Sequence, residues 1–257
     1  MERILVIGGD SLIARALVAR TKCYATSRAA VTLDAFPFDL RSDRMNLASL
    51  PVVPVVIICA AINGEAACSR DPKLAEEVNA IGPGRITRHF RQFGSDVIFL
   101  SSDIADQSAG VYAATKRAGE TNVLEAGGRV IRLGKVWDPA QPGILSEWFA
   151  SLSAGADISV LSDLFVAPIG LDVAVTGILQ AIDRDEKLSV LTSRSAISYG
   201  QIAEYIVKRA GASPDQISMK TIDCGPSPHL TPSAWFAAPD PIECLESVVN
   251  ALIAASN

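Results

Sequence analysis

Short apolar runs alternate with longer stretches of helical periodicity along the first half of the chain. Buried parallel strands have near-continuous apolar runs of this kind, and helices between them cover both faces of the sheet. The pattern therefore predicts an α/β fold with a doubly wound parallel sheet. The predicted strands are Ile4–Ile7, Cys23–Thr26, Ala35–Phe38, Val55–Cys59, Asp96–Leu100 and Arg129–Arg132.

The second half of the chain has a different pattern of shorter elements. These segments are too short to predict a core of their own, so we expect a small lobe at the carboxyl edge of the sheet, where α/β folds bind ligands. The predicted elements are a helix at Ile144–Ala154, a strand at Ser159–Leu161, a helix from about Asp172, a strand at Val190–Thr192, a helix at Tyr199–Ala210 and a C-terminal helix after Pro241.

The first predicted strand runs into the turn Gly8-Gly9-Asp10-Ser11 and then into helical periodicity. Backbone N–H groups and the positive end of a helix dipole at such a turn attract a pyrophosphate. In the pattern Gly-x-x-Gly-x-x-Gly the three positions are Gly8, Ser11 and Ala14. Ser11 is small enough for close phosphate approach and can donate a hydrogen bond. The degraded pattern alone fits an ordinary strand-to-helix turn equally well.

A second motif follows the predicted strand that ends near residue 100. Ser101-Ser102-Asp103 precedes Tyr112 and Lys116, which lie four residues apart and share one helix face. A phenol titrates near pH ~10, and a neighbouring ammonium is expected to favour the phenolate and lower that pKa. Ser102 could hold a carbonyl oxygen beside the phenol. Asp103 could support Ser102 or cap the following turn, and we expect the cap. The set predicts a proton-transfer site for interconverting a carbonyl and an alcohol.

Asp71-Pro72 predicts an N-cap followed by proline at the first helical position. The helix should run toward Phe93 and bend at Gly82-Pro83-Gly84, because Pro83 has no N–H to donate to the carbonyl of Asn79. Two interpretations remain open. The bend is a packing kink satisfied by water, or it exposes polar groups of Asn79 toward the active-site cleft.

Composition narrows the classes of partner. The 257 residues are 49% hydrophobic with a net charge of −5 and no basic cluster, so nucleic acids and anionic membranes are not expected partners. The longest apolar stretch, residues 52–62, is too short to span a bilayer, and we expect no signal peptide. Five cysteines without Cys-x-x-Cys spacing predict reduced thiols in a cytoplasmic protein. The two histidines have no metal-ligand spacing, so no metal is expected.

These motifs resemble the extended short-chain dehydrogenase/reductases, and within them most closely the dTDP-4-dehydrorhamnose reductases of the sugar-nucleotide branch. The resemblance covers most of the chain and implies a Rossmann-type dinucleotide-binding domain at residues 1–137. Residues 138–257 would then form a small substrate-binding lobe, with one or more segments returning to the main sheet. The most specific matching pieces are residues 79–84 and 116–120.

The resemblance also implies roles for individual residues. Tyr112 would donate the proton, Lys116 would hold the cofactor ribose and tune Tyr112, and Ser102 would orient the carbonyl. The further positions expected to contact the cofactor are Gly8, Ser11, Leu12, Ile13, Asp39, Leu40, Cys59, Ala60 and Ala61.

The end of the second predicted strand bears on the choice of cofactor. An acidic residue there would bind the ribose hydroxyls of NAD, but this chain has Ser27-Arg28. A hydroxyl and a guanidinium suit the 2′-phosphate of NADP, so we expect NADP rather than NAD. The alternative is that Arg28 is an exposed loop residue without that role.

The connection between Ser102 and Tyr112 is shorter than the family norm, and Ile104 stands where an aromatic residue is usual. The favoured function is an NADP-dependent reductase of a small-molecule carbonyl substrate, with a keto-sugar nucleotide as one candidate. An epimerase or dehydratase that recycles its cofactor is an alternative. A non-catalytic regulatory subunit that binds a partner protein is another. Family habit and the small residues Ala114 and Ala118 predict a homodimer through the helix after Asp71 and the helix carrying Tyr112.

Overall fold

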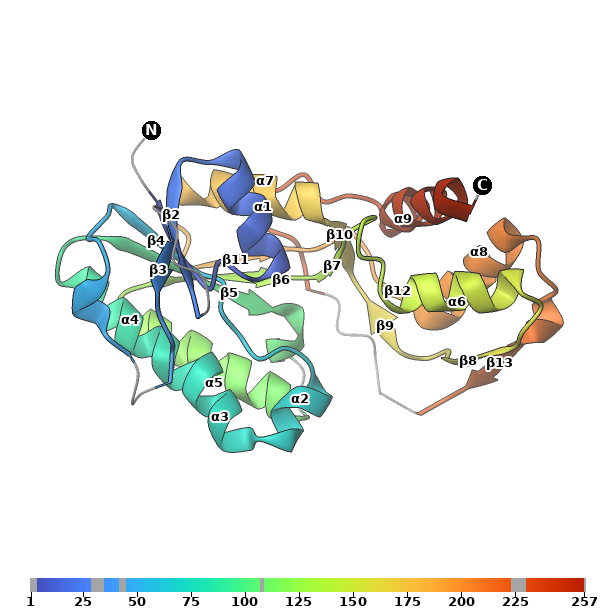
Figure 1. Ribbon diagram of the computed structural model, residues 1–257, viewed down its shortest axis with the longest axis horizontal. Coiled ribbons are helices and arrows are strands. Elements are labelled where there is room, and N and C mark those ends of the chain that lie inside the picture. Colours follow the sequence, from blue (N-terminus) through green and yellow to red (C-terminus); the bar gives the residue numbers. More distant parts are fainter. Residues whose placement is uncertain (1–3, 29–34, 42–44, 107–108, 223–229, 257) are drawn as a thin grey trace. The chain divides into compact units, whose positions relative to one another are not determined.

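A computed structural model describes residues 4–28, 35–41, 45–106, 109–222 and 230–256 (Figure 1). The chain forms two compact units. Unit 1 comprises Met1–Leu133 and Ala174–Val190, and unit 2 comprises Gly134–Val173 and Leu191–Asn257. The chain thus leaves unit 1 and returns to it before it completes unit 2.

Unit 1 is built on a seven-stranded sheet among the described residues. The pairings among β1 to β6 are parallel, which confirms the predicted doubly wound sheet. Because β1 lies between β2 and β4, the order of the strands reverses beside β1, and α/β folds bind ligands at such a reversal. In sheet order the strands are β11 (Leu188–Leu191), β6 (Arg129–Leu133), β5 (Asp96–Ser102), β4 (Val55–Ile58), β1 (Ile4–Ile7), β2 (Cys23–Ser27) and β3 (Ala35–Pro37).

Helices cover both faces of this sheet (Figure 1). α1 (Leu12–Arg20) and α7 (Leu171–Ile182) lie on one face, where the guanidinium of Arg20 donates to Thr176 Oγ1 at 3.3 Å. The other face carries α2 (Glu65–Arg70), α3 (Pro72–Glu76), α4 (Gly82–Arg91) and α5 (Val111–Glu125). Apolar strand residues such as Leu5, Ile58 and Phe99 are fully buried between these layers. Burial on both faces explains why the strands have continuous apolar sequences.

The helix after Asp71 is interrupted, as the sequence predicts. The Asp71 carboxylate accepts the Leu74 N–H at 3.0 Å and caps α3, and a π-helical turn (Glu77–Ile81) separates α3 from α4. The interruption does not expose Asn79, whose side chain is fully buried. Its amide instead bonds both backbone groups of Ile62, so the interpretation that Asn79 is exposed toward a cleft is wrong. The missing proline N–H is accommodated by the wider turn.

The π-helical turn also brings the chain against α5. A Cβ built on Gly119 of α5 would lie 2.1 Å from the carbonyl oxygen of Asn79, so no side chain fits there. The Asn79 amide donates to Thr115 Oγ1 at 3.2 Å, and Asn122 donates to the Ala80 carbonyl at 3.0 Å. Backbone contact and side-chain hydrogen bonds therefore fix α5 against this turn.

Unit 2 has a hydrophobic core of its own, so the expectation of a lobe without an independent core is wrong. The apolar faces of its helices contribute together to one cluster that includes Leu145, Trp148, Ile202 and Leu245. The helices are α6 (Ile144–Ser153), α8 (Tyr199–Ala210) and α9 (Pro241–Ser256). Its strand pairs are β7 (Lys135–Trp137) with β10 (Pro168–Gly170), β8 (Ile158–Leu161) with β13 (Ile217–Lys220), and β9 (Phe165–Val166) with β12 (Ile197–Ser198).

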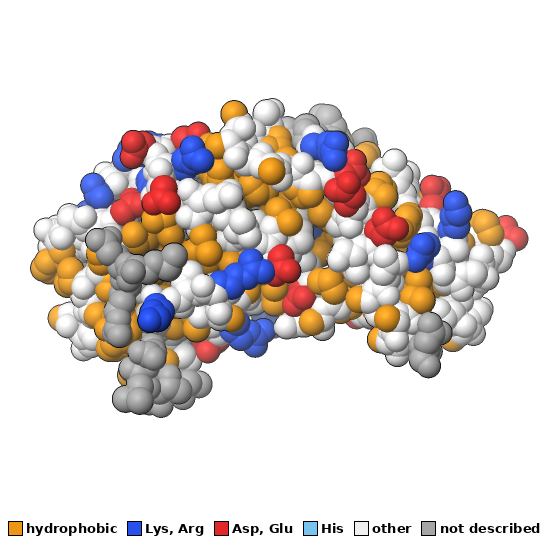
Figure 2. Space-filling view, turned by 90° about the horizontal axis from the view of Figure 1, so that it is seen from above, with side chains coloured by type: hydrophobic (Ala, Val, Ile, Leu, Met, Phe, Trp, Pro, Cys, Tyr) orange, Lys and Arg blue, Asp and Glu red, His pale blue; other side chains and the backbone are white. Residues whose placement is uncertain are grey.

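Acidic and basic side chains are interspersed with hydrophobic ones over the face drawn in Figure 2. None of the helices in the described ranges has the length and apolar character needed to cross a bilayer. The mixed signs of charge match the small net charge of the sequence.

We predict that Gly119→Ala destabilises the protein by about 2 kcal/mol. A backbone carbonyl cannot move aside as a side-chain end can, and overpacking costs about 1–3 kcal/mol, which outweighs the helix propensity of alanine. Urea denaturation of the variant measures the loss. Gly170→Ala is the control, because an added Cβ there meets no atom within 4 Å. Equal stability of Gly119→Ala and the unaltered protein would contradict the close approach.

Candidate active site

The glycine turn after β1 is held against β2 and β4. The N–H of Gly8 donates to Thr26 Oγ1 at 2.9 Å, and the N–H of Gly9 donates to the Thr26 carbonyl at 2.7 Å. Gly8 has φ +88°, and a Cβ there would lie 2.6 Å from that of Ala60. Only glycine meets both the conformation and the close approach, so the backbone remains open toward the pocket.

Ser11 is the N-cap of α1. Its hydroxyl oxygen accepts the Ala14 N–H at 3.3 Å, which leaves its own proton free to be donated to a ligand. The first turn of α1 presents backbone N–H groups and the positive end of the helix dipole. These features fit the pyrophosphate of a dinucleotide.

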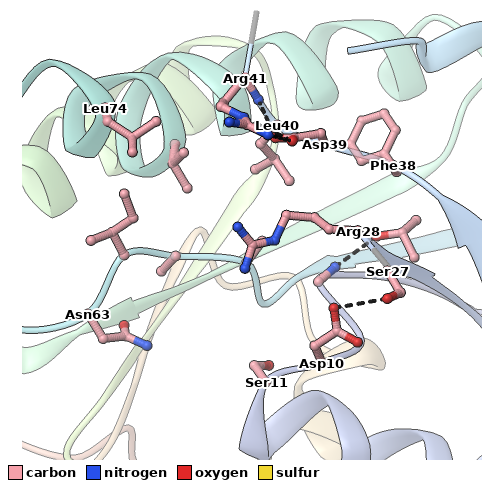
Figure 3. A pocket seen from close by; sticks show the side chains of 16 residues that line it. Asp10, Ser11, Ser27, Arg28, Phe38, Asp39, Leu40, Arg41, Asn63 and Leu74 are labelled. Carbon is pink, nitrogen blue, oxygen red and sulfur yellow. Dashed lines mark hydrogen bonds and ion pairs between the residues drawn. The ribbon is translucent and has the colours of Figure 1, made fainter. Parts of the chain in front are cut away.

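A pocket of about 360 Å³ opens beside this turn (Figure 3). It gathers eight of the predicted cofactor residues from the ends of four strands. These are Gly8, Ser11, Ser27, Arg28, Asp39, Leu40, Ala60 and Ala61. The other predicted cofactor residues, Leu12, Ile13, Cys59, Tyr112 and Lys116, are not among the residues that line it. Leu12 and Ile13 begin α1, and the backbone N–H of Cys59 is bonded to the Ile7 carbonyl at 2.9 Å.

Charged side chains of both signs line the pocket. Arg28 extends its guanidinium into the pocket in Figure 3. The Ser27 hydroxyl donates to Asp10 Oδ2 at 3.0 Å. A carboxylate from the turn after β1 therefore lies at the end of β2, where the sequence of β2 itself has no acidic residue. Asp39 accepts from the backbone N–H and side chain of Arg41, which neutralises its charge. The case for a 2′-phosphate therefore depends mainly on Arg28.

Tyr112 lies in the first turn of α5, and its hydroxyl donates to Asn63 Oδ1 at 3.3 Å. Asn63 also lines the pocket, so the phenol is connected to the dinucleotide site through one side chain. The Ser102 hydroxyl donates to Asp103 Oδ1 at 3.0 Å and accepts the Ile104 N–H at 3.4 Å. Asp103 therefore supports Ser102, the alternative to the expected cap, and the Ser102 hydroxyl also bonds the backbone of the turn.

The pKa of Tyr112 is raised to about 12, the reverse of the expected direction. Burial disfavours the phenolate, and the adjacent Ser102 hydroxyl only partly offsets this by hydrogen bonding. Lys116 does not act on the phenol, because its ammonium is directed elsewhere. At neutral pH the phenol therefore retains its proton.

Lys116 is almost fully buried on the inner face of α5. Its Nζ donates to the Leu100 carbonyl at 2.7 Å and lies 4.2 Å from the centre of the Phe99 ring. Burial lowers the pKa of Lys116 to about 7, while the neighbouring Glu120 carboxylate partly opposes the shift. Lys116 is thus poised between its charged and neutral forms near neutrality.

The short connection between β5 and α5 is anchored at its start. Arg132 forms ion pairs with Glu120 at 2.8 Å and with Asp106 at 2.9 Å. Arg117 donates to the Ala105 carbonyl at 3.0 Å. These bonds fix the 3₁₀ turn Asp103–Asp106 against β6 and α5.

Sequence reasoning missed several polar residues that line the pocket, among them Asp10 and Asn63. Both follow the carboxyl ends of predicted strands, which is where ligand-binding residues gather. Asp10 follows β1, next to the end of β2, so its proximity to Ser27 could have been inferred from the strand order. For Asn63 the signal was weaker, because its contact with Tyr112 depends on the path of the loop after β4.

Comparisons with known proteins identify relatives of this chain and solved structures with the same fold. A dTDP-4-dehydrorhamnose reductase of Mycolicibacterium smegmatis (strain ATCC 700084 / mc(2)155) is 25% identical over 252 residues, covering 90% of this chain and 76% of that protein. A Bacillus anthracis str. Ames dTDP-4-dehydrorhamnose reductase in complex with NADP has a TM-score of 0.78 at 16% identity, covering 98% of each chain. A Thermus thermophilus UDP-glucose 4-epimerase complex with NAD has a TM-score of 0.75 at 18% identity, covering 98% of this chain and 99% of the other.

The two structural neighbours establish the fold, and a family match goes further. A family model described as the RmlD substrate binding domain matches residues 1–234, which include the glycine turn, the pocket and the Tyr112–Lys116 helix. The chain therefore belongs to the RmlD substrate binding domain family, the dTDP-4-dehydrorhamnose reductase-like branch of the extended short-chain dehydrogenase/reductases.

Proposed function

We propose that this NAD(P)-dependent oxidoreductase reduces the carbonyl of a keto-sugar nucleotide, with NADPH as the preferred cofactor. The observation that carries the proposal is the Tyr112 phenol, bonded to Asn63 of the dinucleotide pocket and adjacent to Ser102. The name of the Mycolicibacterium relative supplies the substrate class. Family membership and the nicotinamide-bound structural neighbours support the cofactor class.

Different pocket residues would bind different parts of the dinucleotide. The turn at Gly8 and Ser11 would hold the pyrophosphate, and Arg28 would hold a 2′-phosphate with its fork of donors. Asp39 and Leu40 would contact the adenine, while Ala60 and Ala61 let the dinucleotide lie close to β4. When bound, the nicotinamide supplies the hydride.

Tyr112 performs the proton transfer in this proposal. Its raised pKa keeps the proton on the phenol oxygen at neutral pH, which is the form that a proton donor to a developing alkoxide requires. Ser102 orients the carbonyl oxygen through its hydroxyl. Lys116 does not line the pocket, so its proposed contact with the cofactor ribose rests on the family resemblance.

An epimerase would use the same residues without net consumption of cofactor. A non-catalytic regulatory subunit would bind a partner protein and show no turnover. The assay that separates the three is NADPH absorbance at 340 nm with dTDP-4-dehydrorhamnose as substrate. Stoichiometric loss of NADPH supports the reductase. Product without NADPH loss would favour the epimerase, and no reaction with any keto-sugar nucleotide would favour the regulatory subunit.

We predict that Tyr112→Phe lowers turnover by about 10²- to 10⁴-fold, the usual contribution of general acid catalysis. Phenylalanine keeps the ring packing but removes the proton that the hydroxyl donates to Asn63. NADPH affinity should stay nearly unchanged in a fluorescence titration, since Tyr112 is not among the residues that line the pocket. Near-normal reduction by Tyr112→Phe would overturn the mechanism.

NADPH should bind more tightly than NADH, and Arg28→Ala should weaken NADPH binding by about 1.5–3 kcal/mol.

Asp10→Asn should strengthen NADPH binding by about 1 kcal/mol, because it removes a partly screened negative charge near the expected 2′-phosphate. The affinity of each variant for NADH is the internal control, since NADH lacks that phosphate. Equal affinities for both cofactors in the unaltered protein would refute the NADP preference.

We predict that Lys116→Met stabilises the folded protein by about 1–4 kcal/mol at pH 7, while reducing NADPH affinity and turnover. The pKa of Lys116 falls from 10.5 to about 7 on folding, so above pH 7 unfolding takes up a proton. The cost of burying Lys116 is therefore greatest at pH 7 and below, and it shrinks as the pH rises toward 10.5. Urea denaturation from pH 6 to 10 checks this, with exposed Lys73→Met as the control.

We propose that the protein is a homodimer that uses the outer face of α5. Ala114 and Ala118 are exposed on that helix, so neither is taken up by packing within the chain. Small residues at this spacing allow a second helix to approach closely. Ala118→Arg should shift the dimer toward monomer in light scattering at micromolar concentration. A monomeric unaltered protein would rule the proposal out.

A further inference from the structure

The helix that carries Tyr112 has no local N-cap. The N-cap position of α5 is Gly110, which has no side chain and adopts φ +99°. The first N–H groups of a helix have no partner within it and usually bond a Ser, Thr, Asp or Asn at this position. A distant residue performs this task here.

The carboxylate of Glu65 bonds both N–H groups at the start of α5. Glu65 Oε1 accepts the Val111 N–H at 2.9 Å, and Oε2 accepts the Tyr112 N–H at 3.0 Å. Glu65 is the first residue of α2, and α3, the π-helical turn, α4 and β5 separate α2 from α5 along the chain. The Ser69 hydroxyl donates to Glu65 Oε1 at 2.6 Å and supports the carboxylate from behind. A carboxylate at a helix N-terminus is also stabilised by the helix dipole.

Gly110 and Glu65 are matched to one another. A Cβ on Gly110 would lie 2.4 Å from Glu65 Oε2, so any side chain there would displace the carboxylate. Because Gly110 has no side chain, the Glu65 carboxylate can reach the backbone N–H groups at the start of α5. The hydrogen bonds of Glu65 to Ser69, Val111 and Tyr112 lower its pKa, so it remains charged at neutral pH.

The segment from Ile62 to Glu65 holds Tyr112 at two points. Asn63 accepts the phenol hydroxyl, and Glu65 accepts the backbone N–H of the same residue. The segment itself is fixed, because the buried Asn79 amide bonds both the N–H and the carbonyl of Ile62 at 2.8 and 2.9 Å. The orientation of the phenol is thus set by one short segment that Asn79 anchors.

We propose that Glu65 is a positioning residue for Tyr112. The Glu65 carboxylate fixes the orientation of the first turn of α5, and that orientation directs the phenol toward Asn63 and Ser102. This role rests on the proposed function. Glu65 is not among the residues that line the dinucleotide pocket, so it acts through Tyr112 and not on the cofactor. The short connection between Ser102 and Tyr112 is anchored at its start by Arg132 and Arg117, and Glu65 anchors its end.

Glu65→Gln and Glu65→Ala test the proposal, with Glu125→Gln as the matched control. Glu125 is an exposed glutamate at the other end of α5, so its variant removes the same charge without touching the cap. With NADPH and dTDP-4-dehydrorhamnose, kcat should fall about 10-fold in Glu65→Gln and up to about 10²-fold in Glu65→Ala, the range expected for a displaced catalytic group. NADPH affinity should stay within about twofold of the unaltered protein.

A second measurement does not depend on turnover. The ultraviolet titration of the tyrosines, taken as the difference from Tyr112→Phe, reports the pKa of Tyr112 directly. Glu65→Gln should raise that pKa, because a phenol turned away from Ser102 loses the hydrogen bond that favours the phenolate. Amide hydrogen exchange at Val111 and Tyr112 should accelerate, while exchange in the last turn of α5 should not change.

The two proposals can fail separately. If the unaltered protein shows no reduction but Glu65→Gln shifts the pKa of Tyr112, the positioning role stands and the reductase function falls. If reduction occurs and neither Glu65 variant changes kcat or the pKa of Tyr112, the positioning role is overturned. Faster amide exchange with unchanged kcat and an unchanged pKa would reduce Glu65 to a helix cap without influence on the phenol, and it would overturn the proposal as well.

Discussion

The buried side-chain amide of Asn79 is the interaction on which the arrangement of the site depends. It bonds the backbone of Ile62 after β4 and the hydroxyl of Thr115 on α5, so it joins the dinucleotide pocket to the helix that carries Tyr112. A fully buried amide is costly unless its groups are paired, and here both ends of the amide have partners. The π-helical turn and the absence of a side chain at Gly119 are what bring Asn79 within reach of both segments.

Lys116 shows a conflict between folding and chemistry. Burial is unfavourable for an ammonium, and the Phe99 ring, the Leu100 carbonyl and Glu120 only partly compensate. Burying Lys116 lowers the free energy of unfolding, but it places a hydrogen-bond donor on the inner face of the helix that carries Tyr112. Sites of this kind are held by rigid surroundings, and the ion pairs of Arg132 supply part of that rigidity.

The sheet and the glycine turn were predictable, because continuous apolar runs and a strand-turn-helix pattern are local signals. The Asp71 cap and the bend at Pro83 were predictable for the same reason. The pKa of Tyr112 was not, since it depends on burial and on which way the Lys116 side chain turns. The core of unit 2 was missed because each helix alone has too little apolar surface, and only their combination buries enough. Asp10 and Asn63 were missed because their partners lie on other strands or loops.

The position of the edge strand β11 affects how the chain folds during synthesis and where it can be divided into fragments. It belongs to unit 1 but follows residues 134–173, which belong to unit 2. On the ribosome, the sheet of unit 1 cannot be completed until Leu191 has emerged. Before that point the chain exposes the unpaired edge of β6, a template for incorrect pairing. A fragment that stops at residue 133 would carry the same open edge permanently, so cutting the gene at the first unit boundary would not isolate a complete nucleotide-binding unit.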